Sequence, residues 1–133
     1  MKKPSFLVVG GITFGLSLSL ATAVFAHHSF TSEYDATKKV SLKGTIVKME
    51  WINPHSWLHI NVTEPDGKVV EWALEFGNPN QLLHQGWRKG DLPVGATVTV
   101  DGFRARNGSP TANARTVVLA NGKELFTGGS KPD

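Results

Sequence analysis

The chain has 133 residues, with 14 basic and 11 acidic side chains, five histidines and no cysteine. The lack of cysteine excludes disulfides, thiolate nucleophiles, iron–sulfur sites and sulfur-rich zinc sites. The length fits one folded domain. Without Lys2 and Lys3 the remaining chain carries 12 basic and 11 acidic residues, and this balance predicts no polyanionic partner such as nucleic acid.

The first 26 residues have the three parts of an export signal. Lys2 and Lys3 form the charged start, residues 6–20 are apolar, and the small residue Ala26 ends the segment. An uncleaved anchor is the alternative, because residues 6–25 are about as long as the ~20 residues that span a bilayer. The glycines of this stretch and the small residue at its end favour cleavage. We expect a periplasmic protein with no membrane span after cleavage.

The rest of the chain then divides into three segments. We expect one domain over residues 27–127, whose first part (27–39) is an extended N-terminal arm. Residues 128–133 are small and polar and predict a disordered tail.

Short alternating runs predict three strands in the first half of the domain. Residues 40–51 change face midway, which predicts a strand that bends at Gly44. Residues 56–63 direct every second side chain to the core and place His59 on the other face. An Asp-Gly turn leads to residues 68–76, for which we expect Glu71 and Glu75 to face outward. The core-facing residues expected in these last two strands are Leu58, Ile60, Val62, Val70, Trp72, Leu74 and Phe76.

The second half predicts one short helix and two more strands. Asn78-Pro79 has the signature of a helix start, and Gly86 follows the segment as a stop signal. Residues 97–105 form the fourth expected strand, in which Gly102 changes the phase, and residues 114–119 form the fifth. A short return over residues 123–126 follows an Asn-Gly turn.

This order of elements predicts an all-β fold. Three strands, a helix and two strands, with bent first and fourth strands, are typical of a small five-stranded OB-like barrel with one short helix between strands 3 and 4. A two-sheet sandwich is the alternative, but it does not explain the position of the helix.

A histidine-rich segment is the strongest candidate for a binding surface. Alternation puts side chains around the Asn-Pro turn and the second strand on one face, which predicts a shallow groove for a small ligand or a partner protein. The residues of this expected groove are Trp51, Asn53, His55, Trp57 and His59. Packing in the core or at its rim is the alternative for the tryptophans, Trp87 included, and Arg104, Arg106 and Arg115 are expected to form a solvated rim.

Cleavage after Ala26 also creates a possible copper site. His27 would then present its α-amine beside its own imidazole Nδ1, and these two nitrogens can chelate one metal ion. His28, His55 or His59 would supply further nitrogens for the tetragonal set that Cu(II) favours. The alternative is a flexible polar start without metal, so no cofactor is required.

Conventional catalysis finds little support in the residue pattern. Glu71 and Glu75 lie four strand positions apart, about 13 Å, which is too far for a pair of glycosidase carboxylates. The chain contains no nucleophile elbow, phosphate loop or dinucleotide fingerprint.

Several segments together resemble a family of small exported proteobacterial proteins that is catalogued as a domain of unknown function. The segments are His27-His28-Ser29-Phe30, Glu33-Tyr34-Asp35, Leu42-Lys43-Gly44-Thr45, Trp51-Ile52-Asn53-Pro54-His55, Trp72, Gly86-Trp87 and Thr111-Ala112-Asn113-Ala114-Arg115. The resemblance implies a periplasmic location, and it implies neither an activity nor a metal.

Three functions follow as hypotheses. The first is a periplasmic binding or accessory protein without catalysis, which takes a small molecule or a partner protein in the groove beside His55 and Trp57. The second is a copper carrier or buffer that uses the chelate at His27. The third is a copper-dependent redox enzyme.

Overall fold

A computed structural model describes residues 30–128 of the chain. The expected signal, the residues His27 and His28, and the segment 129–133 lie outside the described residues. Strands make up about half of the described part, with one α-helix between the third and fourth strands, so the predicted all-β class and the place of the helix are confirmed.

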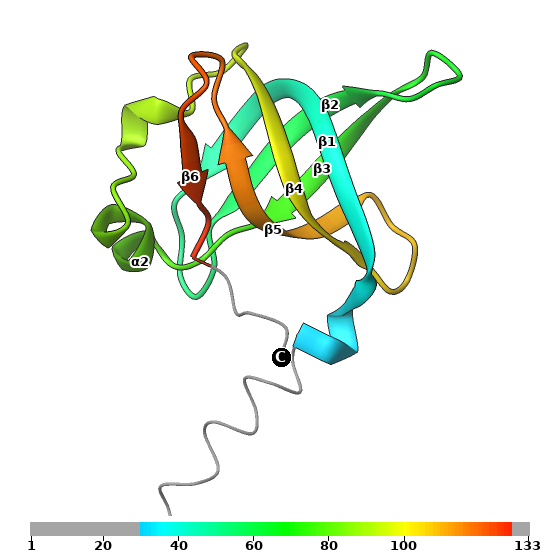
Figure 1. Ribbon diagram of the computed structural model, residues 1–133, viewed down its shortest axis with the longest axis horizontal. Helices are drawn as coiled ribbons and strands as arrows, with labels where there is room; N and C mark the ends of the chain where they lie inside the picture. Colours follow the sequence, from blue (N-terminus) through cyan, green and yellow to red (C-terminus); the bar gives the residue numbers. More distant parts are fainter. Residues whose placement is uncertain (1–29, 129–133) are drawn as a thin grey trace, which may run out of the picture.

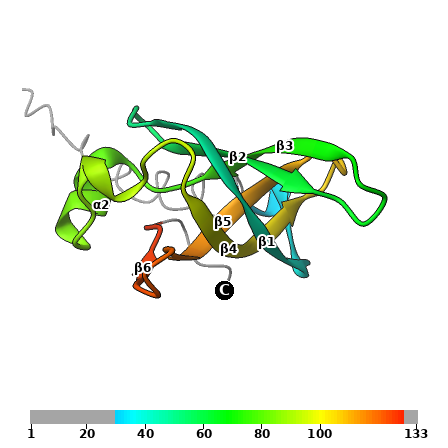
Figure 2. The ribbon, with the colours of Figure 1, turned by 90° about the horizontal axis from the view of Figure 1, so that it is seen from above.

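Six strands form one strongly curved sheet (Figures 1 and 2). Their order along the sheet is β3-β2-β1-β4-β5-β6, and β3 also pairs with β5. That last pairing is parallel and covers Ala73 to Glu75 on β3, whereas the other pairings are antiparallel. Hydrogen-bonded neighbours therefore form a closed circuit through β1, β2, β3, β5 and β4. The strands are β1 (Tyr34–Glu50), β2 (Trp57–Thr63), β3 (Val69–Glu75), β4 (Thr97–Ala105), β5 (Thr111–Val118) and β6 (Glu124–Phe126).

The core lies on the concave side of this sheet. Alternate residues of β2 and β3 are buried there, as predicted, and only Val70 among them keeps partial exposure. Trp87, which the sequence left open between core and groove, is fully buried, and its ring lies 5.6 Å from that of Phe76. The main core residues are Ile46, Leu58, Ile60, Trp72, Leu74, Phe76, Leu82, Trp87, Val98, Val100 and Val117.

The helix α2 (Pro79–His84) starts and stops where its sequence signals predict. The Asn78 side chain accepts a hydrogen bond from the Gln81 amide, and the Gln81 side chain accepts one from the Asn78 amide, which satisfies two amides at the helix start. Gly86 follows the helix with φ of 98°, a conformation that suits glycine. A 3-10 turn, η1 (Lys89–Asp91), leads on to β4. Figures 1 and 2 show α2 at one end of the sheet, while the β2–β3 hairpin extends from the other end.

The bend predicted at Gly44 is wrong in position. Gly44 pairs regularly with Val98, and the register of β1 against β2 shifts between Ile46 and Lys48 instead. The change of face along β1 is therefore caused by a bulge at Val47. Gly44 serves a different purpose, because a Cβ there would lie 2.5 Å from the backbone oxygen of Asn61. Glycine lets β1 and β2 approach closely at this point.

The chain before β1 packs on the outer side of the sheet. Residues 30–33 form a helical turn, which Figure 1 shows beneath the first part of β1. Phe30 and Tyr34 are buried, and the Phe30 ring lies 5.6 Å from Tyr34 and 5.9 Å from Phe103 of β4. These aromatic residues form a second, smaller core together with Ala105. Within residues 30–128, no helix is long and apolar enough to cross a membrane.

Candidate functional site

Three side chains from distant parts of the chain meet at Glu75, the last residue of β3. Oε2 of Glu75 accepts a hydrogen bond from the Tyr34 hydroxyl, and Oε1 lies at hydrogen-bond distance from Nδ1 of His55. An ionised carboxylate only accepts hydrogen bonds, so Nδ1 of His55 carries the proton in this pair. The other ring nitrogen, Nε2, belongs to a side chain that is 48% exposed. In the neutral ring, this contact selects the tautomer with the proton on Nδ1, and Nε2 is then an acceptor.

The expectation that Glu75 faces solvent is wrong. Glu75 does lie on the side of β3 opposite the core residue Leu74, but it is only 4% exposed. Tyr34 covers it from one side, and Asn113 of β5, itself 4% exposed, is its partner in the parallel pairing. A carboxylate so buried is costly unless its oxygens are bonded, and both oxygens of Glu75 are.

Tyr34 is perturbed in the same environment. Burial is the main cause that raises the pKa of its phenol far above the usual range, and the hydrogen bond to Glu75 and the negative charge of that residue add to the effect. The hydroxyl is protonated at neutral pH like that of any tyrosine, and the raised pKa keeps it a donor to Glu75 at alkaline pH as well. The Tyr34–Glu75–His55 chain thus ends in a histidine that can bind a proton, a metal ion or a polar group at Nε2.

His59 belongs to a separate cluster. Its Nδ1 lies 3.0 Å from Glu71 and its Nε2 lies 3.1 Å from Glu50, so it links β1, β2 and β3 on the outer face. Both ring nitrogens of His59 therefore lie at hydrogen-bond distance from a carboxylate. Glu50 also accepts a hydrogen bond from Lys48, and this contact, followed by that with His59, lowers the pKa of Glu50. His59 is occupied by these carboxylates.

The remaining residues of the expected groove lie around these two clusters. Trp57 is half-buried and pairs with Glu50 on one side and with Glu75 on the other, so it lies between the clusters. Trp51 is also half-buried and packs against the core, whereas Asn53 is exposed in the loop before β2.

Two hollows lie elsewhere on the surface. One lies on the outer face of β1 and β4 and the other beside the β2–β3 hairpin, and none of the five groove residues lines either of them.

The three arginines expected to form one rim are separated. Arg104 stacks 5.3 Å from the Trp72 ring in the second hollow, Arg115 lines the first, and Arg106 donates to the Thr31 carbonyl.

A complete metal site is not present among the described residues. Between residues 30 and 128, no group of three or more histidine or acidic side chains could hold a metal ion. The expected copper ligands are His27, His28 and His55. The structure describes His55, whereas His27 and His28 lie outside the described residues.

A model of a family of unknown function, DUF6152, matches residues 16–114. The chain belongs to the DUF6152 family. No curated protein and no solved structure matches it. The match confirms that the resemblance is to a family of unknown function, and the matched residues include Tyr34, His55 and Glu75.

Sequence reasoning selected His55 in this DUF6152 chain but missed its two partners. Tyr34 stands in one of the segments that carry the family resemblance, and it is the single tyrosine of the chain. Glu75 stands between two apolar residues at the end of a core strand, where an acidic residue needs partners if it is buried. These two signals together would have pointed to the pair.

Proposed function

We propose that the protein is a periplasmic accessory protein without catalysis of its own, which binds a small ligand or a partner protein at the surface around His55. We further propose that its sheet is an OB-like barrel. The closed circuit of pairings β1-β2-β3-β5-β4 and the helix between β3 and β4 support this assignment.

One observation carries the binding proposal, namely the half-exposed His55 held by the buried Glu75, which is itself bonded to Tyr34. A surface histidine normally samples several rotamers and both tautomers, and fixing it has an entropic cost. Here Glu75 holds the ring and Tyr34 holds Glu75, so that Nε2 is preorganised for a contact. Trp57 is half-buried and pairs with Glu75, so it adds apolar surface beside this contact.

Native mass spectrometry of the protein released from the periplasm tests this proposal. We expect the wild-type protein to carry a bound small molecule or partner, and the His55→Gln variant to lose most of it. His84→Gln is the matched control, because His84 is an exposed histidine on α2. Equal occupancy of the two variants, or absence of the protein from the periplasmic fraction, would contradict the proposal.

Copper binding is the second candidate, and a specific contact favours it. Phe30 is the first residue that the structure describes, and its ring packs against Tyr34. The Tyr34 hydroxyl donates to Glu75, and Glu75 contacts His55. His27 stands three positions before Phe30, so the two residues are at most about 11 Å apart along the chain. A histidine whose Nδ1 donates to a carboxylate is also the usual arrangement of a metal ligand.

Intact-mass measurement with and without one equivalent of Cu(II) tests this second candidate. It requires a mature chain that starts at His27 and retains one copper ion, with weaker retention in His55→Gln than in His84→Gln. A mature chain that starts at any other residue eliminates the terminal chelate. The binding proposal above survives that result, since it depends on His55 alone.

A further inference from the structure

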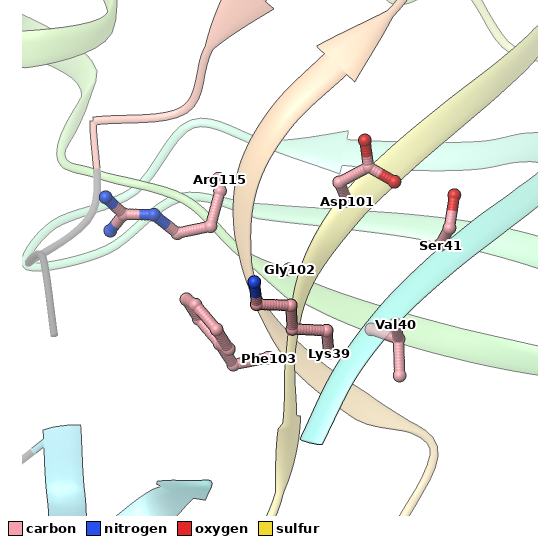
Figure 3. Close-up of a pocket in the computed structure, with 7 residues that line it drawn as sticks. All are labelled: Lys39, Val40, Ser41, Asp101, Gly102, Phe103 and Arg115. Carbon is pink, nitrogen blue, oxygen red and sulfur yellow. The ribbon is translucent and has the colours of Figure 1, made fainter. Parts of the chain in front are cut away.

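A hollow of about 410 Å³ lies on the outer face of β1, β4 and β5, away from the groove residues around His55 (Figure 3). Its lining combines two basic side chains, one acidic side chain and one aromatic ring. In Figure 3, Lys39 extends across β4 toward Phe103, with Arg115 to one side and Asp101 to the other. The complete lining is Lys39, Val40, Ser41, Asp101, Gly102, Phe103 and Arg115.

A bulge in β5 places Arg115 in this hollow. Asp101 pairs with Thr116, but the next residue of β4, Gly102, pairs with Ala114, so Arg115 is an extra residue in β5. A bulge redirects the side chain at that position. Gly102 makes this possible, because a Cβ there would lie 2.2 Å from the Asn113 oxygen. The strands approach so closely at the floor of the hollow that only glycine fits.

Register places the other side chains in two rows. Lys39 pairs with Phe103, and Ser41 pairs with Asp101, so each pair faces the same side of the sheet. The Phe103 ring is packed edge-on against Phe30 at 5.9 Å, which fixes one wall of the hollow. The ring is half-buried and keeps apolar surface beside Lys39.

The charges around the hollow favour an anion. Lys39 and Arg115 contribute two positive charges and Asp101 one negative charge, which leaves the lining with a net charge of +1. Burial lowers the pKa of the Arg115 guanidinium, as expected for a cation that is partly removed from water.

We propose that this hollow binds a small monocarboxylate with a flat apolar body, such as an aromatic acid. The guanidinium of Arg115 has the planar geometry that pairs with a carboxylate, and the Lys39 amine adds a second positive charge. The apolar body lies against the Phe103 ring. Phosphate fits less well, because it has no apolar surface for Phe103 and its second charge is repelled by Asp101.

Titration of the purified protein with benzoate, followed by amide chemical shifts, tests the proposal. We expect saturable shifts in the segments of β1 and β4 that line the hollow. Benzamide has the same shape without the charge, and acetate has the charge without the ring. Both should bind at least about tenfold more weakly than benzoate, because each lacks one half of the interaction.

Three variants locate the site. Arg115→Gln and Lys39→Gln should each weaken benzoate binding about tenfold. Lys43→Gln should leave it unchanged, because Lys43 is exposed on the same strand but does not line this hollow. If Arg115→Gln does not fold, the exposed Lys39 position decides the test.

Three results would overturn the assignment. These are equal affinity for benzamide and benzoate, shifts that map to another part of the sheet, and wild-type affinity in the lysine variant. His55→Gln should bind benzoate as the wild type does, which separates this site from the proposed function at His55.

Discussion

Glu75 is the residue on which the candidate site depends, because it satisfies a buried phenol and a surface imidazole at once. Glu75→Ala leaves the buried Tyr34 hydroxyl without its acceptor, and we expect the free energy of unfolding to fall by about 1–3 kcal/mol. Urea denaturation measures this loss. Glu71→Ala is the control: Glu71 is exposed and pairs with His59, so its loss should stay below about 1 kcal/mol. Equal losses of unfolding free energy in the two variants would show that the buried Tyr34–Glu75 hydrogen bond contributes nothing to stability.

Tyr34 offers a direct spectroscopic test, since the chain has no other tyrosine. Its pKa in the folded protein is raised above that in the unfolded chain, which is about 10. The neutral phenol therefore contributes stability that is fully present below about pH 10 and is lost as the pH rises toward the folded-state pKa. We expect tyrosinate absorbance to appear only together with loss of the β-sheet circular dichroism. Tyrosinate formation near pH 10 in a protein whose circular dichroism is unchanged would contradict this environment.

At the scale of the elements, two glycines set how closely the strands approach. A Cβ at Gly44 or Gly102 would lie within 2.5 Å of a backbone oxygen in the neighbouring strand, which is far too close. Gly44→Ala and Gly102→Ala should each lower the free energy of unfolding by about 1–3 kcal/mol, measured by thermal or urea denaturation. Gly90→Ala should be close to neutral, because a Cβ added there would meet no other atom within 4 Å. A neutral Gly102→Ala variant would contradict the close contact beneath the hollow.

Local signals predicted most of these elements. Alternation located β4 to the residue, and capping residues located α2, because both depend on neighbours within a few positions of the chain. The signal for a bend in β1 was also present, but its position was wrong. A change of face can be produced by any residue between Leu42 and Met49, and only the pairing with β2 selects Val47.

The candidate site was less predictable, because its contacts join distant segments. Alternation placed Glu75 on the outer side of β3, which is correct, but it could not show that Tyr34 covers that side from 41 residues earlier in the chain. Arg115 likewise enters its hollow through a bulge that depends on the pairing of two strands. The family match shows that the chain belongs to DUF6152, but it gives no information on these contacts.

At the scale of the whole molecule, the circuit of strands is closed at its shortest pairing. Three residue pairs join β3 to β5, and the Ala73 amide donates to the Pro110 carbonyl beside them. The second, smaller core around Phe30 and Tyr34 lies across this junction. Tyr34 bonds to Glu75 at the end of β3. Phe30 packs on Phe103, and Phe103 pairs with Asn113 of β5. The segment before β1 therefore stabilises the closure as well as the site.

Hydrogen exchange tests this coupling between the N-terminal segment and the closure. Phe30→Leu keeps an apolar side chain but removes the ring contacts with Tyr34 and Phe103. We expect amide exchange at the β3–β5 junction, with Ala73 as the reporter, to become at least about tenfold faster, since a local opening there has lost part of its stabilising packing. Amides of β2, which is paired on both sides, should keep their wild-type rates. Equal acceleration in both strands would mean that the ring supports the fold as a whole, and an unchanged Ala73 rate would mean that the closure does not depend on the N-terminal segment.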